Sequence, residues 1–248
     1  MTAAPADVIS WGRERARTAR WRGDESVALL TPVPNAPMPS AEFVRRCLGM
    51  LAERGYARVV TAALSPLEQS GFLAAGFDVE QRLHLLAMDL TKGLPPVPPG
   101  LRLRRVPRSR RDDVLVVDRS AFTPFWQLDA AGLTDSLKAT PAVRFRMAVD
   151  GQARRDGQRG QEQVAGYAIC GRSGTRGFVQ RLAVSPTCQR GGTGRRLLLD
   201  GLHWLASRGA TTAAVNTQVG NAAALSLYLA TGFREEPVGL SVLSAGLR

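Results

Sequence analysis

The sequence is poor in lysine, histidine and cysteine, and it contains no long apolar run. Three cysteines in 248 residues, Cys47, Cys170 and Cys188, are too few and too scattered to predict a disulfide framework or a metal site. No apolar run approaches the ~20 residues of a membrane-spanning helix, so no membrane contact is expected. Residues 1–10 lack a basic region followed by an apolar core, which argues against a secretory signal and favours a cytoplasmic location.

The excess positive charge lies in the second half of the chain. The net charge is +12, and only Lys92 and Lys138 are lysines, so almost all of it is arginine. Residues 1–100 hold 11 basic and 10 acidic side chains, whereas residues 101–248 hold 22 and 11, a net of +11. The second half is therefore expected to bind an anionic partner, either a phosphorylated small molecule or a nucleic acid.

A proline-rich stretch divides the sequence. Residues 92–100 read KGLPPVPPG, and four prolines within five residues disfavour helix and sheet and favour an extended spacer. We therefore expect one domain over residues 1–91, a linker over residues 92–100 and a second domain over residues 101–248. Residues 151–163 are polar and glycine-containing, which indicates a loop.

The second domain has the hydrophobic pattern of an α/β fold. Apolar alternation or short apolar runs predict strands, and helical spacing predicts helices. The expected strands are residues 101–106, 143–149, 164–170, 177–184, 211–219 and 237–243, and the expected helices are 110–122, 129–139, 194–208 and 222–230. A hairpin followed by β-α-β-α-β indicates an α/β fold with a mixed sheet.

A glycine-rich turn follows the apolar strand that ends at Val184. Its sequence is Gln189-Arg190-Gly191-Gly192-Thr193-Gly194-Arg195, and it leads into the long helix. Glycines permit tight backbone angles, and the unpaired N–H groups of a helix N-terminus attract phosphate oxygens. The turn has neither the Lys-Ser/Thr ending of a P-loop nor the G-x-G-x-x-G spacing of a dinucleotide fold. A glycine-rich connection with solvated arginines is the alternative interpretation.

The segment that follows makes a mere glycine-rich connection a less favoured interpretation. Asn221, Ala224 and Tyr228 share one face of a short helix that stops at Gly232. With these residues the chain resembles the GNAT superfamily of acyl-CoA-dependent N-acyltransferases over residues 101–243. Gln189, Gly192 and Gly194 match the family's Q/R-x-x-G-x-G/A pyrophosphate motif, and the second segment matches its N-x-x-A…L-Y…G-F signature.

The resemblance implies an acetyltransferase that moves an acetyl group from acetyl-CoA to a primary amine, on a protein N-terminus or a small molecule. In the family the amine attacks the thioester directly, and proximity supplies most of the acceleration. The backbone N–H of Leu182 or Ala183 is expected to stabilise the oxyanion, and Tyr228 matches the general acid. Tyr228 packing against the cofactor is the alternative. The residues expected to bind acetyl-CoA are Leu182, Ala183, Val184, Gln189, Arg190, Gly191, Gly192, Thr193, Gly194, Arg195, Asn221 and Ala224.

The sequence does not identify a general base. Members of the family often carry a glutamate on the central strand, but the corresponding segment here is Val179-Gln180-Arg181. A water-mediated base, or an acceptor that arrives deprotonated, fits best. His203 lies between Leu202 and Trp204 on the long helix, where we expect a structural role.

Aromatic residues mark the expected acceptor pocket. Phe122, Phe125 and Trp126 lie between the first two helices of the second domain, where they form either a wall of the pocket or part of the core. Asn216 is expected to orient an acceptor or a water molecule.

The first half resembles a degenerate copy of the second. Leu51–Gly55 (LAERG) parallels Leu205–Gly209 (LASRG) at an offset of 154 residues, and Gly76-Phe77 parallels Gly232-Phe233 at an offset of 156. Residues 58–64 are strand-like, and residues 67–75 are helical. The fold class is therefore an α/β GNAT fold in two tandem copies. In the first copy, Met38-Pro39-Ser40 replaces the glycine turn, Phe72 replaces Tyr228 and Ser65 replaces Asn221, so it is not expected to bind CoA. Two unrelated α/β halves are the alternative.

Two other function classes remain open. One is a non-catalytic acyl-CoA-binding or regulatory module, because no base is identified. The other, less favoured, is a nucleic-acid binder, for which Arg154, Arg155 and Arg159 form the one local basic cluster. The expected partners are acetyl-CoA and an amine acceptor, and the protein is either a monomer or a homodimer.

Overall fold

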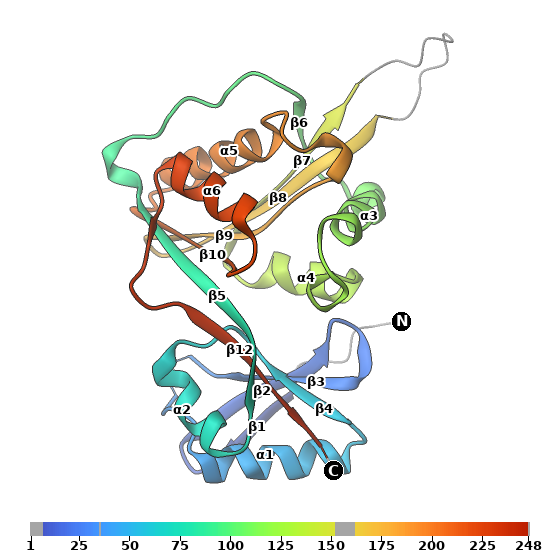
Figure 1. Ribbon diagram of the computed structural model, residues 1–248, viewed down its shortest axis with the longest axis vertical. Helices are drawn as coiled ribbons and strands as arrows, with labels where there is room; N and C mark the ends of the chain where they lie inside the picture. The colour runs from blue at the N-terminus through green and yellow to red at the C-terminus, as the bar shows by residue number, and fades with distance from the viewer. Residues whose placement is uncertain (1–6, 35, 152–161, 248) are drawn as a thin grey trace. The chain divides into compact units, whose positions relative to one another are not determined.

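The protein consists of two compact units with interleaved segments. A computed structural model describes residues 7–34, 36–151 and 162–247 (Figure 1). The first unit comprises Met1–Leu85, Asn216–Ala222 and Glu236–Arg248, and the second comprises Leu86–Val215 and Ala223–Glu235. Within the described ranges, no helix is long and apolar enough to cross a membrane.

The first unit contains a mixed sheet with two helices. Its strand order is β1-β2-β3-β4-β12-β5, in which only β3 and β4 pair in parallel. Its strands are β1 (Asp7–Trp11), β2 (Glu14–Trp21), β3 (Asp24–Pro32), β4 (Arg58–Thr61), the start of β5 (Asp78–Asp89) and β12 (Leu240–Gly246), and its helices are α1 (Ala41–Glu53) and α2 (Pro66–Ala74).

The second unit repeats this plan and adds two helices. From β10 outward its strand order is β10-β9-β8-β7-β6, and only β9 and β10 pair in parallel. Its strands are β6 (Arg102–Arg105), β7 (Ala142–Asp150), β8 (Gln163–Ser173), β9 (Arg176–Val184), most of β10 (Thr212–Gln218) and β11 (Arg234–Glu235). Its helices are α3 (Arg111–Ala121), α4 (Ala130–Lys138), α5 (Thr193–Ser207) and α6 (Ala222–Thr231), with short 3-10 turns η1 (Leu90–Lys92), η2 (Arg108–Arg110), η3 (Pro124–Trp126) and η4 (Pro186–Cys188).

Each unit takes a strand from the distant half of the sequence. In the first unit the C-terminal strand β12 lies between β4 and β5, and Leu64 and Ser241 exchange two backbone hydrogen bonds of 2.8 and 2.9 Å. In the second unit the end of β5 pairs with β11 through Leu86 and Ala87. The units therefore do not have the boundaries that the proline-rich stretch suggests, because strand pairing joins residues far apart in sequence.

The proline-rich residues 92–100 belong to the second unit. Leu94 and Val97 pack against the apolar cluster formed by α5, α6 and β10. The carbonyl of Pro95 lies 2.8 Å from His203 Nε2, and the carbonyl of Pro98 accepts a hydrogen bond from Arg196 Nη1. The segment thus runs along α5 rather than between the units, and His203 serves as one of its attachment points.

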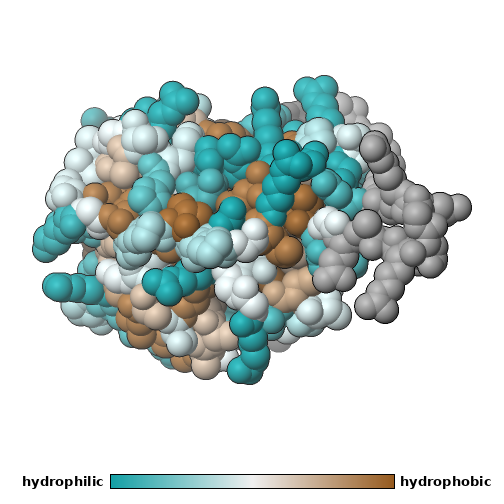
Figure 2. Space-filling model, turned by 90° about the horizontal axis from the view of Figure 1, so that it is seen from above, coloured by the Kyte–Doolittle hydropathy of each residue, from teal (hydrophilic) through white to brown (hydrophobic). Residues whose placement is uncertain are grey.

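The helices of the second unit cover both faces of its sheet. Successive residues of a strand point to opposite faces, so β8 contributes Tyr167 and Ile169 to one core and Ala168 and Cys170 to the other. The α3 and α4 side chains pack with the first pair, whereas α5 packs with the second (Figure 1). On the face shown in Figure 2, apolar side chains are interspersed with hydrophilic ones.

Equivalent turns and aromatic pairs follow the helices in both units. Gly55 and Gly209 both have positive φ after their helices, at 87° and 82°. Phe72 and Phe77 form an edge-to-face pair with ring centroids 5.3 Å apart, and Tyr228 and Phe233 form one at 5.7 Å. In each pair the later residue donates a 3.1 Å backbone hydrogen bond to the earlier one. These matches give the two copies the same fold.

The equivalence differs from the sequence alignment at the start of the long helix. Ser40 is the N-cap of α1 and Gly192 is the N-cap of α5, whereas the motif alignment pairs Ser40 with Gly194. The two helices start at different positions of the alignment because α1 has 13 residues and α5 has 15.

In the first unit, a side chain of the protein itself binds at the N-terminus of the long helix α1. The Glu14 carboxylate accepts hydrogen bonds from the Ser40 backbone N–H and hydroxyl, and the same hydroxyl accepts one from the Phe43 N–H at 3.2 Å. A side chain on Gly71 of α2 would place its Cβ 1.8 Å from the Pro39 carbonyl oxygen. An internal carboxylate and close backbone contact therefore fill this end of α1.

Substituting Gly71 tests this close contact. We expect Gly71→Ala to lower the free energy of unfolding by about 1–3 kcal/mol or more, because its Cβ clashes with rigid backbone. Gly49→Ala is the matched control: Gly49 lies in α1 with open space around it, so alanine should raise stability by about 0.5–1 kcal/mol. Urea denaturation of both variants measures this, and equal stabilities would contradict the close approach of α2 to Pro39.

Candidate active site

The parallel strands β9 and β10 separate after a short pairing. They are in register only from Arg176↔Thr212 to Phe178↔Ala214, although β9 continues for six residues to Val184. In the first unit, the equivalent strands β3 and β4 stay paired from Val27↔Arg58 through Leu30↔Thr61, the last residue of β4. In the second unit, residues 179–184 of the central strand β9 therefore lack a parallel partner in β10, whereas in the first unit β3 extends only by Thr31 and Pro32 beyond its last pair with β4.

A β-bulge at Gln180 lies at the start of the separation. Arg181 pairs with Ile169 and Val179 pairs with Cys170, so Gln180 is an extra residue in β9. A bulge bends a strand and redirects its backbone groups. Gln180 itself lies over Gly171, where any Cβ would come within 2.7 Å of its side-chain nitrogen.

The alternation of hydrogen bonds along β9 shows which backbone groups face the open edge. Ser185 N–H donates to the Ala165 carbonyl of β8 at 2.8 Å. In an antiparallel pair this direction alternates, so the N–H groups of Leu182 and Val184 point away from β8, whereas that of Ala183 points toward it. Of the two oxyanion donors expected from the sequence, Leu182 has the required direction and Ala183 does not.

The glycine turn forms an open helix N-terminus at the end of β9. Gly192 has φ of 79° and is the N-cap of α5, without any side-chain cap, and Arg190 also has positive φ at 62°. A Cβ on Gly192 would meet no atom within 4 Å, so there is open space at this position of the turn. Unpaired amide N–H groups and the helix dipole make this end suitable for a phosphate group.

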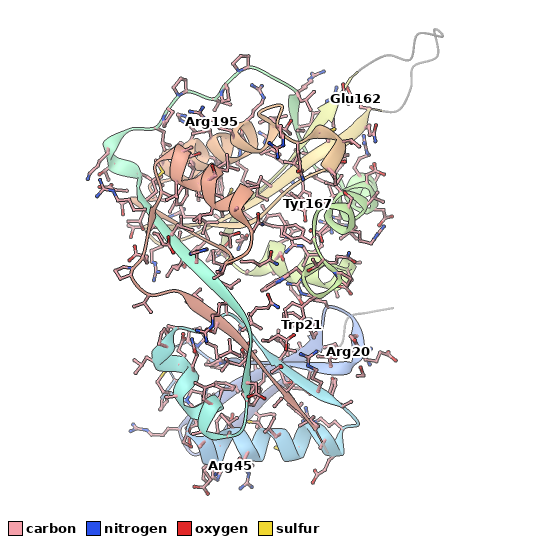
Figure 3. The ribbon with its side chains drawn as sticks, viewed as in Figure 1. Arg20, Trp21, Arg45, Glu162, Tyr167 and Arg195 are labelled. Carbon is pink, nitrogen blue, oxygen red and sulfur yellow. The ribbon has the colours of Figure 1, made fainter. Side chains whose placement is uncertain are left out.

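Neighbouring side chains support the turn. Gln189 Nε2 donates to the Val184 carbonyl at 3.2 Å, and Leu227 of α6 lies 3.4 Å from the Cβ position of Gly194. The exposed residues of the turn are Gln189, Arg190, Gly191 and Arg195, whereas Thr193 is buried. Figure 3 shows Arg195 on α5. The structure thus brings together the predicted phosphate-binding residues 189–195 and the end of β9.

Tyr228 is a residue of α6, and it is buried in an apolar cluster to which α5 also contributes. Its side chain is 5% exposed, and its hydroxyl makes no hydrogen bond with the described residues. Burial raises the pKa of this hydroxyl, Cys170 adds to the increase and the positive charge of Arg181 opposes it. The hydroxyl therefore stays protonated across the physiological pH range and has a proton to donate.

An ion pair with a fully buried carboxylate contacts the expected acceptor loop. Asp118 of α3 is 0% exposed and accepts four hydrogen bonds, from Arg181 Nε and Nη2, the Tyr167 hydroxyl and the Leu128 N–H. Arg181 Nη2 also donates to the Trp126 carbonyl at 2.6 Å. Four acceptor positions of the carboxylate are filled, so Asp118 has no free lone pair with which to act as a general base.

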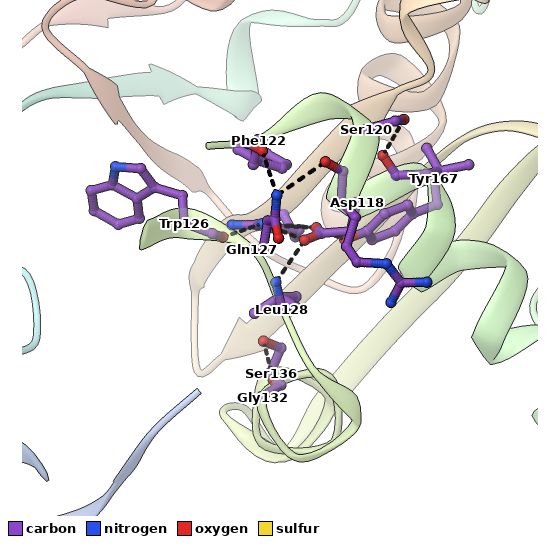
Figure 4. A network of polar contacts seen from close by, with 12 residues as sticks. Asp118, Ser120, Phe122, Trp126, Gln127, Leu128, Gly132, Ser136 and Tyr167 are labelled. Atoms are coloured by element: carbon purple, nitrogen blue, oxygen red, sulfur yellow. Dashed lines mark hydrogen bonds and ion pairs between the residues drawn. The ribbon is translucent and has the colours of Figure 1, made fainter. Parts of the chain in front are cut away.

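The aromatic residues of the acceptor loop are held by this network. Phe122 lies against the Arg181 guanidinium, with Cζ 3.6 Å from the ring centroid. Gln127 Nε2 donates to the carbonyls of Arg119 and Phe122, which closes the loop (Figure 4). The Trp126 ring extends away from the network and packs edge-to-face with Phe125 at 5.1 Å. All three aromatic rings are half-buried.

The remaining predicted site residues lie at the boundary between segments. Asn216 is exposed near the end of β10, and Asn221 immediately precedes α6; both belong to residues 216–222, which are grouped with the first unit. Ala224 of α6 packs against the cluster that contains Tyr228. Arg154, Arg155 and Arg159, the basic cluster considered for nucleic acid, lie outside the described residues.

Sequence reasoning missed the partnership of Asp118 and Arg181. Its signal is an acidic residue on the apolar face of α3, in line with Val114 and Leu115 and following Val117. A charged residue on such a face needs a buried partner, and Arg181 directly precedes the apolar end of β9, residues 182–184. The pairing itself depends on tertiary structure.

Comparison with known proteins identifies similarities over this part of the chain. The model of the acetyltransferase (GNAT) family matches residues 118–233. The aminoglycoside N(6′)-acetyltransferase type 1 of Klebsiella aerogenes is 33% identical over 103 residues, which are 42% of this chain and 66% of that protein. The chain thus spans slightly less than two thirds of this relative's length.

Solved structures share the fold of the whole chain. A tandem GNAT protein from the clavulanic acid biosynthesis pathway aligns over 95% of this chain and 79% of its own, with a TM-score of 0.66 and 15% identity. A structure from Novosphingobium aromaticivorans, described as a putative acetyltransferase of the GNAT family, aligns over 96% and 91% with a TM-score of 0.59 and 19% identity. The expected mixed α/β fold is confirmed.

The environments of the cysteines predict which thiol reacts. Burial raises the pKa of Cys47 and of Cys170 to about 12, so almost none of either thiol is ionised at pH 8. We expect Ellman's reagent to modify one thiol in the native protein, the half-buried Cys188, and all three after unfolding. Cys188→Ser should abolish the native reaction and Cys170→Ser should not. Rapid modification of two thiols in the native protein would contradict the burial of Cys47 and Cys170.

Proposed function

Residues 118–233 match the acetyltransferase (GNAT) family model, and from this premise we propose that the protein transfers the acetyl group of acetyl-CoA to a primary amine. The observation that carries the proposal is the separation of β9 from β10 beside the open N-terminus of α5. An exposed strand edge suits the amide groups of the pantetheine arm, and the helix N-terminus suits the diphosphate.

Each part of acetyl-CoA has a proposed partner in the second unit. The diphosphate accepts hydrogen bonds from the backbone N–H groups of the first turn of α5, and Arg190 and Arg195 add positive charge nearby. The pantetheine arm pairs with the backbone of Leu182 and with the Val184 N–H, which face the open edge. The Val184 carbonyl already accepts a hydrogen bond from Gln189 Nε2. Acetyl-CoA supplies an activated acyl group as its thioester.

The acceptor amine attacks the thioester carbon directly. The C–N bond forms while the C–S bond breaks, and the negative charge that develops on the carbonyl oxygen is stabilised by the Leu182 N–H. The thiolate takes the hydroxyl proton of Tyr228, the attacking nitrogen loses a proton to water, and Tyr228 regains one from solvent. Phe122, Phe125 and Trp126 form the wall against which the acceptor lies.

The first unit is proposed to bind no acetyl-CoA. Glu14 occupies the N-terminus of α1, and the equivalent strands β3 and β4 do not separate. Phe72 has no hydroxyl where Tyr228 has one. The protein therefore has one acyl-CoA site for each chain. Binding without turnover would favour the alternative of a regulatory acyl-CoA-binding module.

A pair of valine substitutions tests the site at α5. Gly192 and Gly209 flank the same helix with φ of 79° and 82°, and a Cβ at either position would meet no atom within 4 Å. Valine should therefore cost about 1–2 kcal/mol of backbone strain at both positions. We expect only Gly192→Val to weaken acetyl-CoA binding, by about 10-fold or more, because its side chain fills the space before the first turn. Calorimetric titration measures both affinities, and equal affinities for the two variants would contradict the proposed site.

Removal of the Tyr228 hydroxyl tests the proton donor. Tyr228→Phe should lower kcat by on the order of 10²-fold or more while the affinity for acetyl-CoA and the melting temperature stay nearly unchanged. The melting temperature should not fall, because the hydroxyl has no hydrogen-bond partner among the described residues. Because its pKa is raised, the wild type should not lose activity through Tyr228 ionisation between pH 7 and 9. An unchanged kcat would contradict the role of Tyr228 as proton donor and would leave it a packing role against the cofactor.

A further inference from the structure

The acceptor loop is unusually well fixed for an exposed connection. Residues 122–128 are attached to the Asp118–Arg181 pair at three points: the Leu128 N–H, the Trp126 carbonyl and the face of the Phe122 ring. Within the pair the Asp118 side chain is 0% exposed, whereas the Arg181 side chain keeps 10% of its surface exposed. A ligand that binds along this loop therefore meets a preorganised surface.

Arg181 retains donor capacity after making these contacts. Its Nε and Nη2 bind Asp118, and Nη2 also binds the Trp126 carbonyl. The structure shows no hydrogen bond from Nη1 to any described residue, and this nitrogen is not among the buried side-chain atoms that lack a partner. A guanidinium has five N–H donors in a fixed plane, so Nη1 still offers two to a ligand.

Arg181 is close in sequence to the backbone group that is proposed to stabilise the oxyanion. Arg181 directly precedes Leu182, whose N–H faces the open edge of β9. Its charge is also felt at the Tyr228 hydroxyl, whose pKa it lowers against the effect of burial. Arg181 thus contacts the aromatic loop through Trp126 and Phe122, and it belongs to the strand on which the acyl group is proposed to react.

We propose that Arg181 binds an oxygen of a carbonyl or carboxylate group adjacent to the acceptor amine. The acceptor class is then an α-amino acid or the N-terminus of a peptide, rather than a simple alkylamine. This inference rests on the proposed acetyl transfer and adds an acceptor-binding residue to it.

The chemistry of the amine agrees with this class. Asp118 is saturated by four donors, so it neither removes a proton from the acceptor nor binds an ammonium group. An α-amino group has a pKa of about 7.7–8.0, against about 10.4 for an alkylamine such as lysine. Near neutral pH a far larger fraction of the α-amino group is therefore already free to attack.

The test compares acceptors that differ only at the group next to the amine. A panel of amino acids, their dipeptides and the alkylamines that lack the carboxyl group is assayed for CoA release with acetyl-CoA, and kcat/KM is corrected for the free-amine fraction. In the wild type we expect a preference of about 10-fold or more for an acceptor that bears the carbonyl or carboxylate. A higher rate with free amino acids assigns a carboxylate ligand, and a higher rate with dipeptides assigns a peptide N-terminus.

Two variants separate binding from folding. Arg181→Lys keeps a positive charge beside Asp118 but lacks Nη1, and Asp118→Asn combined with Arg181→Gln removes both buried charges together. Both should lose the preference through a higher KM for the carbonyl-bearing acceptor, while acetyl-CoA affinity reports an intact fold. Arg144→Gln with Asp200→Asn is the matched control, because it removes another bidentate pair of the second unit, and it should keep the preference.

The outcomes distinguish this inference from the function on which it rests. Turnover of alkylamines as fast as amino acids and peptides in the wild type overturns the role of Arg181 and leaves acetyl transfer standing. A preference that survives in both Arg181 variants also overturns it. Absence of acetyl-CoA binding, or binding without CoA release for every member of the panel, overturns the inference together with the proposed transfer.

Discussion

The early separation of β9 from β10 is the constraint on which the proposed site of the second unit depends. Parallel pairing for only three residues, followed by the bulge at Gln180, frees the backbone of Leu182 and Val184 from a strand partner. Two elements near this edge are proposed to act with it: the N-terminus of α5, opened by the left-handed conformation of Gly192, and the buried hydroxyl of Tyr228. Without the separation, the same glycine turn would be a solvated loop beside a closed sheet.

The first unit shows what this topology becomes when the separation is absent. There β3 and β4 remain paired to the end of β4, Glu14 binds the start of α1, and the Pro39 carbonyl is packed against Gly71. The buried aromatic pair of the second unit is kept, with Phe72 in place of Tyr228. The elements that build the fold are therefore shared by both units, whereas the elements that would bind an anion are found in one.

Local sequence signals predicted the elements well, because hydrophobic periodicity and helix-capping residues act over a few residues. The expected helices at 110–122, 129–139 and 194–208 are α3, α4 and α5 within two residues at each end. The placement of β12 in the first unit could not be read from its own sequence, since an apolar strand does not specify its partner. For the same reason, the proline-rich residues 92–100 indicated an extended segment but not its attachment to α5 through His203 and Arg196. In the site, the glycine turn and Tyr228 have recognisable patterns, whereas the Asp118–Arg181 pair joins a helix and a strand 63 residues apart.

Each chain is proposed to have a single acyl-CoA site, built on α5 and the free edge of β9. The most direct measurement is the stoichiometry of acetyl-CoA bound to the intact protein, obtained by native mass spectrometry over a range of ligand concentrations. We expect one molecule per chain at saturation, because the corresponding position in the first unit is occupied by Glu14. Two molecules per chain, or none, would contradict the claim.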